Sequence, residues 1–259
     1  MSLKLYSSLK GSGPDVVLLH GLFGSGNNLG SLARSLQPRY AVHSLDLPNH
    51  GRSSWLDCAP IGVMATHVAN WIAEQGLPGV ALVGHSLGGK VAMEIALSRP
   101  ELVSSLVVAD IAPVAYPPRH DAVFAALEAV ANPACSSREE AEARMGNFIG
   151  EPGVIQFLLG SLRRAEDGSY RWRFNLAALG SDYPALCEGP PTGGCYEGPV
   201  RFIRGGQSDY ILDAHWDPIR SLFPQAGLDV LPESGHWLHA EQPALFNGLV
   251  AGFLDAQLS

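Results

Sequence analysis

The sequence has few of the features that mark disulfide-stabilised, nucleic-acid-binding or membrane-spanning proteins. Its four cysteines are scattered and none forms a CxxC pair, so we expect no disulfide framework. The net charge of -8 argues against binding to nucleic acid or to an anionic membrane surface. No apolar run approaches the length of a membrane span, and the N-terminus carries no apolar signal region. We therefore expect a cytoplasmic protein with reduced thiols.

The sequence also lacks metal-ligand spacings, internal repeats and low-complexity tracts. None of the nine histidines lies in a motif such as HExxH, so we expect no metal site. A chain of 259 residues forms either one large α/β domain or two small ones. At this length roughly three quarters of the unfolded surface can be buried, so a substantial core is available.

The most informative stretch is residues 80–92, VALVGHSLGGKVA. A short apolar run leads into Gly84-His85-Ser86-Leu87-Gly88, and a helical pattern of apolar residues follows at once. This is G-x-S-x-G between a strand and a helix, which is the context of a nucleophile elbow. The sharp turn exposes the Ser86 hydroxyl and crowds its neighbours, so glycines are needed at positions 84 and 88. The helix that follows aims free N–H groups, first that of Leu87, at a developing oxyanion.

Strand and helix patterns alternate on both sides of this elbow. The expected strands are residues 16–19, 41–47, 80–83, 106–109, 200–203 and 228–231. The expected helices between and after them include residues 29–36, 61–75 and 244–254. This alternation predicts an α/β fold with a mainly parallel, doubly wound sheet. His20, Ser86 and Asp110 all follow strands, where such sheets bind their ligands.

The alternation is interrupted between residues 114 and 198. Helical patterns occupy residues 119–131 and 153–164 and begin again at Ser136, while residues 170–174 look extended. We interpret this stretch as a helical cap inserted into a single domain formed by residues 1–113 and 199–259. The alternative is a separate domain packed to one side.

Three kinds of side chain then occur in a meaningful order. Ser86 comes first, the aspartates Asp110 and Asp209 follow, and His236 comes last, each just past an expected strand. That order matches the serine, acid and histidine of a hydrolase triad. His236 would take the serine proton and later donate it to the leaving group, while one aspartate would hold its tautomer. The histidines at positions 50, 85 and 239 are expected to be loop or supporting residues.

The chain resembles the α/β-hydrolase superfamily, and most closely the small YbfF-like bacterial esterases and their ABHD11-type relatives. The matching motifs are HGLFGSGNNLGSLA (20–33), LDLPNHGRS (45–53), VGHSLGGKVAM (83–93), DIAPVAY (110–116), VIQFLL (154–159) and GHWLHAEQP (235–243). The match runs from about residue 15 to the end. It implies a serine hydrolase that needs no cofactor and acts on small acyl esters or, as an alternative, acyl thioesters.

The resemblance also bears on the oxyanion hole and on the acid. The second backbone donor, beside Leu87, should come from the loop at His20, where the resemblance favours Leu22 over Phe23. Most α/β-hydrolases carry the acid after the penultimate strand, here Asp209, but in the YbfF-like branch the aspartate of DIAPV, here Asp110, can serve. Spacing does not decide between them, so we lean to Asp209 and keep both.

Phe23 and Trp237 are expected to line an acyl pocket, although core packing would account for each of them equally well. Other reactions on the same triad remain open, namely C–C bond hydrolysis and perhydrolysis. A different class is a signal receptor of this fold, in which the triad binds a small ligand. The residues give no indication of an oligomeric state.

Overall fold

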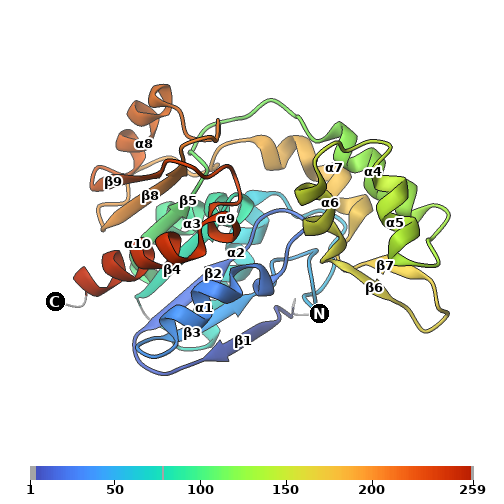
Figure 1. Cartoon of the computed structure of the whole chain (residues 1–259). Coiled ribbons are helices and arrows are strands. Elements are labelled where there is room, and N and C mark those ends of the chain that lie inside the picture. The colour runs from blue at the N-terminus through green and yellow to red at the C-terminus, as the bar shows by residue number, and fades with distance from the viewer. Residues whose placement is uncertain (1–3, 78, 258–259) are drawn as a thin grey trace.

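A computed structural model describes residues 4–77 and 79–257, and a seven-stranded sheet forms its centre (Figure 1). The strand order is β1-β3-β2-β4-β5-β8-β9, and every pair in it is parallel except β1 with β3. The strands are β1 (Ser7–Lys10), β2 (Asp15–Leu19), β3 (Ala41–Leu45), β4 (Val80–His85), β5 (Val103–Ala109), β8 (Val200–Gly205) and β9 (Ala226–Leu231). The mainly parallel sheet confirms the expected architecture.

Helices cover both faces of this sheet because its central strands are apolar on both sides. Along β2, Val17 and Leu19 pack into one buried cluster, while Val16 and Leu18 pack into the other. The first cluster lies under α2 (Ile61–Glu74) and α3 (Leu87–Ser98), and the second under α1 (Gly30–Leu36) and α10 (Pro243–Ala256). The shorter helices of the core are η1 (Gly26–Leu29), η2 (Pro100–Leu102), η3 (Asp213–His215), α8 (Trp216–Leu222) and α9 (Leu238–Glu241).

The inserted segment is mostly helical and gathers on one side of the molecule (Figure 1). We call residues 114–198 the cap. It contains α4 (Asp121–Ala131), α5 (Arg138–Met145), α6 (Pro152–Leu159), α7 (Leu176–Cys187) and a hairpin of β6 (Leu162–Arg164) with β7 (Tyr170–Trp172). The helix expected over residues 153–164 is therefore wrong at its end, because α6 stops at Leu159 and the chain turns into the hairpin. Helix α7 was not anticipated.

Buried charges on α3 hold the end of the cap against the core. The ammonium of Lys90, 3% exposed, donates hydrogen bonds to the carbonyl oxygens of Leu186, Cys187 and Glu188. One helical turn later, the carboxylate of Glu94 accepts hydrogen bonds from the backbone N–H and the hydroxyl of Thr192. We call Lys90 and Glu94 the exit clamp, since together they fix the segment by which the chain leaves the cap.

Apolar side chains from the cap also join the first buried cluster of the core. Leu127 of α4, Leu158 of α6 and Leu179 of α7 belong to the same cluster as the sheet residues Leu19 and Leu82. Part of the contact between cap and core is thus a continuous apolar cluster. Across the residues that the structure describes, no helix is both long enough and apolar enough to cross a membrane.

Candidate active site

Ser86 lies at the turn between β4 and α3, with a backbone conformation that non-glycine residues rarely adopt. Its φ is 52° and its ψ is -117°, so its side chain is lifted above the end of the sheet. The neighbouring glycines make this turn possible. A Cβ on Gly84 would lie 2.2 Å from the carbonyl oxygen of Gly88, and one on Gly88 would lie 2.2 Å from that of Leu19. The sequence pattern therefore predicted the elbow for the right physical reason.

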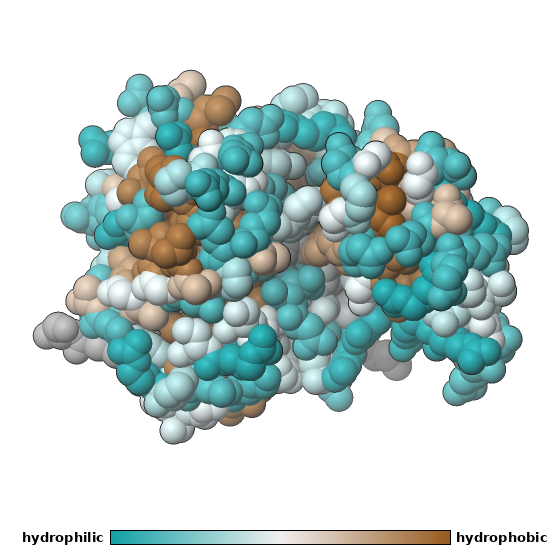
Figure 2. Space-filling model, viewed as in Figure 1, coloured by the Kyte–Doolittle hydropathy of each residue, from teal (hydrophilic) through white to brown (hydrophobic). Residues whose placement is uncertain are grey.

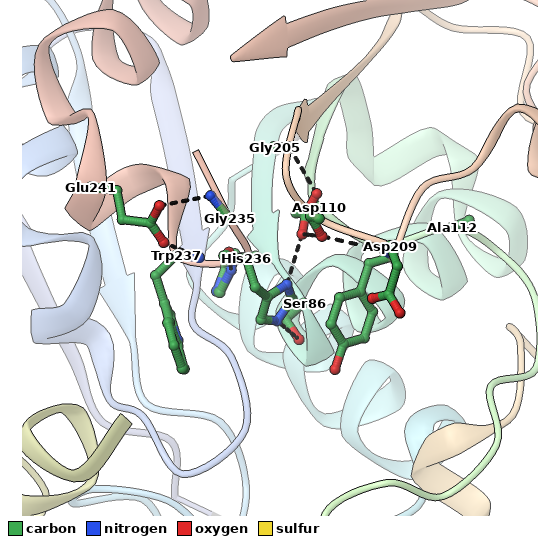
Figure 3. Close-up of polar contacts among 12 residues, drawn as sticks. Ser86, Asp110, Ala112, Gly205, Asp209, Gly235, His236, Trp237 and Glu241 are labelled. Carbon is green, nitrogen blue, oxygen red and sulfur yellow. Dashed lines mark hydrogen bonds and ion pairs between the residues drawn. The ribbon is translucent and has the colours of Figure 1, made fainter. Parts of the chain in front are cut away.

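The imidazole of His236 lies between a hydroxyl and a carboxylate. Its Nε2 is 3.1 Å from Oγ of Ser86, and its Nδ1 is 2.8 Å from Oδ2 of Asp110 (Figure 3). This arrangement can move a proton from the hydroxyl to the ring while the carboxylate stabilises the resulting positive charge. The three residues follow β4, β5 and β9, and parallel strands bring these ends together.

Asp110 is built into the sheet end as a fixed, buried anion. Its side chain is fully buried, and its carboxylate accepts hydrogen bonds from the Gly205 N–H, at 2.9 Å, and from the Ser208 hydroxyl. Its own N–H donates to the carbonyl of Ile203 on β8, and its φ is 53°. These bonds aim the carboxylate at His236 and satisfy a charge that would otherwise be costly to bury.

The structure does not bring Asp209 to His236, so the preference for Asp209 as the acid, which was based on the sequence, is wrong. The Asp209 side chain is 65% exposed and forms an ion pair with the Arg119 guanidinium at 2.7 Å. Figure 3 joins Asp110, and not Asp209, to His236. The loop after β8 still contributes to the site through Ser208, whose hydroxyl donates to Asp110. The sequence pattern gave no reason to select this serine.

His236 is held in place by groups on three sides. The carboxylate of Glu241 accepts hydrogen bonds from the N–H groups of Gly235 and Trp237, which flank the histidine in the chain (Figure 3). The ring of His85 lies with Nε2 2.8 Å from the His236 carbonyl oxygen. The Tyr210 ring stacks on the imidazole with centroids 4.0 Å apart. Glu241 and Tyr210 were also missed by the sequence pattern, because only the folded chain brings them to the histidine.

Burial lowers the pKa of the histidines around this centre. The pKa of His85 is well below its usual value, first because the ring is buried and then because His239 and His236 lie close to it. Burial likewise lowers the pKa of His239 to about 4. These rings are therefore neutral near pH 7. No positive charge on them repels the positive charge that His236 acquires when it accepts a proton.

The backbone beside Ser86 offers two N–H groups for an oxyanion. Leu87 is the first residue of α3, so its N–H has no partner within the helix. In the loop after β2, the N–H of Phe23 already donates to Nε2 of His50 at 3.2 Å, and the Phe23 carbonyl accepts from the Ser161 hydroxyl. The N–H of Leu22 donates to no group among the described residues. This difference favours Leu22 over Phe23 as the second donor.

Two cavities meet at Ser86, in the hollow between core and cap that Figure 2 shows on this face. The larger, of about 270 Å³, has a mostly apolar wall. Phe23 and Trp237 both line it, and so do residues of α4 and α6. Most of the Phe23 ring packs against Phe124 and Phe174, so it serves both core and cavity. Trp237 packs on Phe157 at the wall.

The smaller cavity, of about 50 Å³, also has a mostly apolar wall, to which a few polar side chains contribute. Tyr116, Tyr183 and Lys90 contribute to it, and each already has hydrogen-bond partners in the protein. Four residues line both cavities, namely Leu22, Ser86, Arg119 and His120. A substrate bound at Ser86 can therefore extend into two spaces of different size.

One further group of charged side chains lies outside this centre. The arginines of the cap hairpin, Arg163, Arg164 and Arg171, line a separate hollow that shares no residue with either cavity at Ser86. Arg171 is paired with Asp167 on the same hairpin. No group of three or more histidine, cysteine, aspartate or glutamate side chains suited to a metal ion occurs among residues 4–77 and 79–257.

Comparison with known proteins identifies the family to which the chain belongs. Residues 16–249 match the family described as "Alpha/beta hydrolase family". The "sn-1-specific diacylglycerol lipase ABHD11" of Mus musculus is 39% identical over 249 residues, which cover 93% of this chain and 81% of that protein. "Esterase YbfF" of Escherichia coli (strain K12) is 38% identical over 231 residues, covering 88% of each. The solved structure of a "Marine microorganism esterase" superimposes with a TM-score of 0.94 at 36% identity, covering 97% of this chain and all of that one. This chain therefore belongs to the α/β-hydrolase family, in the branch of YbfF and ABHD11.

Proposed function

We propose that this protein is a serine esterase that hydrolyses carboxylic esters through an acyl-enzyme. The observation that carries the proposal is the position of His236, within hydrogen-bonding reach of both the Ser86 hydroxyl and the Asp110 carboxylate. Two relatives that cover most of the chain carry the names esterase and diacylglycerol lipase, which supports the same reaction class.

The reaction would proceed in two steps. His236 takes the proton of Ser86 as its oxygen attacks the ester carbonyl, and the N–H groups of Leu22 and Leu87 bind the oxyanion. The tetrahedral intermediate collapses when His236 returns the proton to the departing alcohol oxygen. Water then attacks the acyl-enzyme by the same route and releases the carboxylic acid. Asp110 stays ionised throughout and stabilises the imidazolium.

The cavities suggest which part of the ester lies where. Both cavities are mostly apolar, and only the larger has room for a long acyl chain, so the smaller one would take the alcohol part. Thioesters would react by the same route. The hairpin arginines do not border either cavity, so they give no support for a coenzyme A leaving group. We also propose that the chain is one domain, with residues 114–198 as a cap that forms one wall of the site.

Replacement of Ser86 by alanine tests the proposal directly. Ser86→Ala should abolish hydrolysis of p-nitrophenyl butyrate and labelling by a fluorophosphonate, because no other group replaces the nucleophile. Thermal unfolding of the variant, followed by circular dichroism, should show an unchanged fold. Retained labelling in the variant would refute the assignment of the nucleophile. Wild-type protein that is stabilised by esters without turning them over would instead be a ligand receptor.

A further inference from the structure

A second imidazole, that of His120, faces the nucleophile from the cap. It is one of the four residues that line both cavities, and its partners in that group already have roles. Ser86 is the candidate nucleophile, Leu22 offers its N–H to the oxyanion, and Arg119 is paired with Asp209. His120 lies close enough to His236 for the two rings to interact electrostatically. Among these four residues, His120 is therefore the polar side chain that is free to contact a substrate bound at Ser86.

The ring of His120 is fixed by Tyr183 of helix α7. Nδ1 of the histidine is 2.8 Å from the tyrosine hydroxyl, and the two rings pack with centroids 5.3 Å apart. Since one ring nitrogen is bound in this way, the other, Nε2, points away from Tyr183 and bonds to no described residue. Burial first, and then the nearby His236 and Arg119, lower the pKa of His120 to about 4. The ring is neutral at neutral pH and has one N–H.

The hydrogen bonds of Tyr183 assign the position of that N–H. The tyrosine hydroxyl accepts a hydrogen bond from the Arg119 N–H at 3.2 Å, and it has one proton of its own to donate. The Nδ1 atom of His120 is a strong acceptor for that proton, whereas the sulfur of the neighbouring Cys187 is a weak one. When the hydroxyl donates to Nδ1, the imidazole proton resides on Nε2. A neutral hydrogen-bond donor is then presented where the two cavities join.

We propose that His120 is a specificity-determining residue whose Nε2–H binds an oxygen on the alcohol part of the ester. The inference rests on the proposed esterase function. The carbonyl oxygen is bound by the Leu22 and Leu87 N–H groups, and the departing oxygen is met by His236, so the next oxygen along the alcohol falls to His120. The preferred substrates are esters of polyols, in which a free hydroxyl lies two carbons from the ester oxygen.

A matched pair of esters tests this assignment. The esters 2-hydroxyethyl butyrate and propyl butyrate have the same number of heavy atoms and differ by a hydroxyl in place of a methyl group. The wild type should favour the hydroxy ester in kcat/KM by about 2- to 13-fold more than His120→Leu does, since one net hydrogen bond contributes about 0.5–1.5 kcal/mol. Tyr183→Phe, which leaves the tautomer of His120 unassigned, should lose part of the preference.

Two variants separate binding from structure. His120→Gln keeps an amide donor near the position of Nε2 and should retain more of the preference than His120→Leu. His67→Gln, on helix α2 away from both cavities, is the matched control and should leave the ratio unchanged. If His120→Leu and His120→Gln lower both esters in parallel at a constant ratio, His120 only supports the cap and the proposal is wrong. If the wild type hydrolyses both esters equally well, the proposal also fails while the esterase function stands. Absence of any ester hydrolysis would refute the function itself.

Discussion

At the scale of single residues, the acid of the site is the point on which the structure adds most. Asp110 is buried, accepts two hydrogen bonds from β8 and its loop, and reaches His236, whereas Asp209 is exposed and bound to Arg119. A buried carboxylate beside an imidazole keeps the ring in the required tautomer, and an exposed ion pair contributes little.

The two aspartates should therefore respond differently to the same substitution. Asp110→Asn should lower kcat for p-nitrophenyl butyrate by about 10,000-fold, because the amide can neither fix the tautomer nor stabilise the imidazolium. Asp209→Asn is the matched control and should cost less than about tenfold, as expected for a surface ion pair. A larger loss in Asp209→Asn than in Asp110→Asn would overturn the assignment of the acid.

The residues of the elbow and its histidine could be predicted because their signals are local. Ser86 is marked by two glycines that the turn requires, and His236 by its position after the last strand. The choice between Asp110 and Asp209 could not be made, because both follow strands whose ends adjoin the same histidine. Distance and burial decided it, and neither is contained in sequence spacing.

At the scale of elements, helix α3 has two tasks. Its first turn presents Ser86 and the Leu87 N–H, and its second and third turns contribute the exit clamp of Lys90 and Glu94. Burial lowers the pKa of Lys90 to about 8, so the ammonium is retained at pH 7 although it forms no ion pair with any carboxylate that the structure describes. Three carbonyl oxygens near the end of α7 take the place of that partner.

Removal of the ammonium should therefore weaken the fold. Lys90→Met keeps the length of the side chain but removes the ammonium from the three carbonyls of residues 186–188. The Cys187 carbonyl still accepts from the backbone N–H of Tyr116, whereas the other two lose their donor. We expect a loss of about 1–3 kcal/mol in the free energy of unfolding, since buried acceptors without partners are costly and the relief from burying a charge offsets only part of this. Urea titration at pH 7 measures it. Lys10→Met, at an exposed position on β1, should have no effect, and equal stabilities for the two variants would contradict the role of the clamp.

The elements of the sheet were easier to predict than those of the cap. Parallel strands buried on both faces show as continuous apolar runs, and the expected strands fall within the observed ones except at the end of β3. In the cap, the apolar pattern of α6 continues into Leu162, so the pattern did not show where the helix ends and the hairpin begins. Helix α7 has a proline at position 184 and was obscured by it.

At the scale of the whole molecule, the core holds four buried imidazoles that are neutral at pH 7. Burial lowers the pKa of His20 and His239 to about 4 and, together with the nearby His20, that of His50 to about 3, and the pKa of His85 is also lowered. In the unfolded chain each of these rings titrates near pH 6.5. The unfolded state thus binds more protons than the folded state between these values.

Stability should consequently fall steeply in mild acid. The stability that comes from burying these histidines as neutral rings is fully present above pH 6.5. It is lost as the pH falls toward their folded pKa values near 4. Each of the four histidines contributes at most about 1.4 kcal/mol per pH unit to this loss. Urea titrations from pH 7.5 to 5, above the range in which most carboxylates titrate, should show it. His239→Asn removes one of the four groups and should make the slope shallower. A free energy of unfolding that stays constant from pH 7 to 5 would exclude neutral burial of these rings.

The exit clamp has a consequence for protein engineering. Exchanging the caps of related hydrolases is an attractive way to change their substrates, and the obvious crossover points lie where the cap begins and ends in the chain, near residues 114 and 198. Lys90 and Glu94 fall outside those points, on the helix of the nucleophile, yet they hold the last turn of α7 and the connector after it. A transplanted cap whose final residues do not present carbonyls to an ammonium and a donor to a carboxylate would leave two buried charges unpaired directly behind Ser86. A functional chimera has to take these two helix residues from the same parent as its cap.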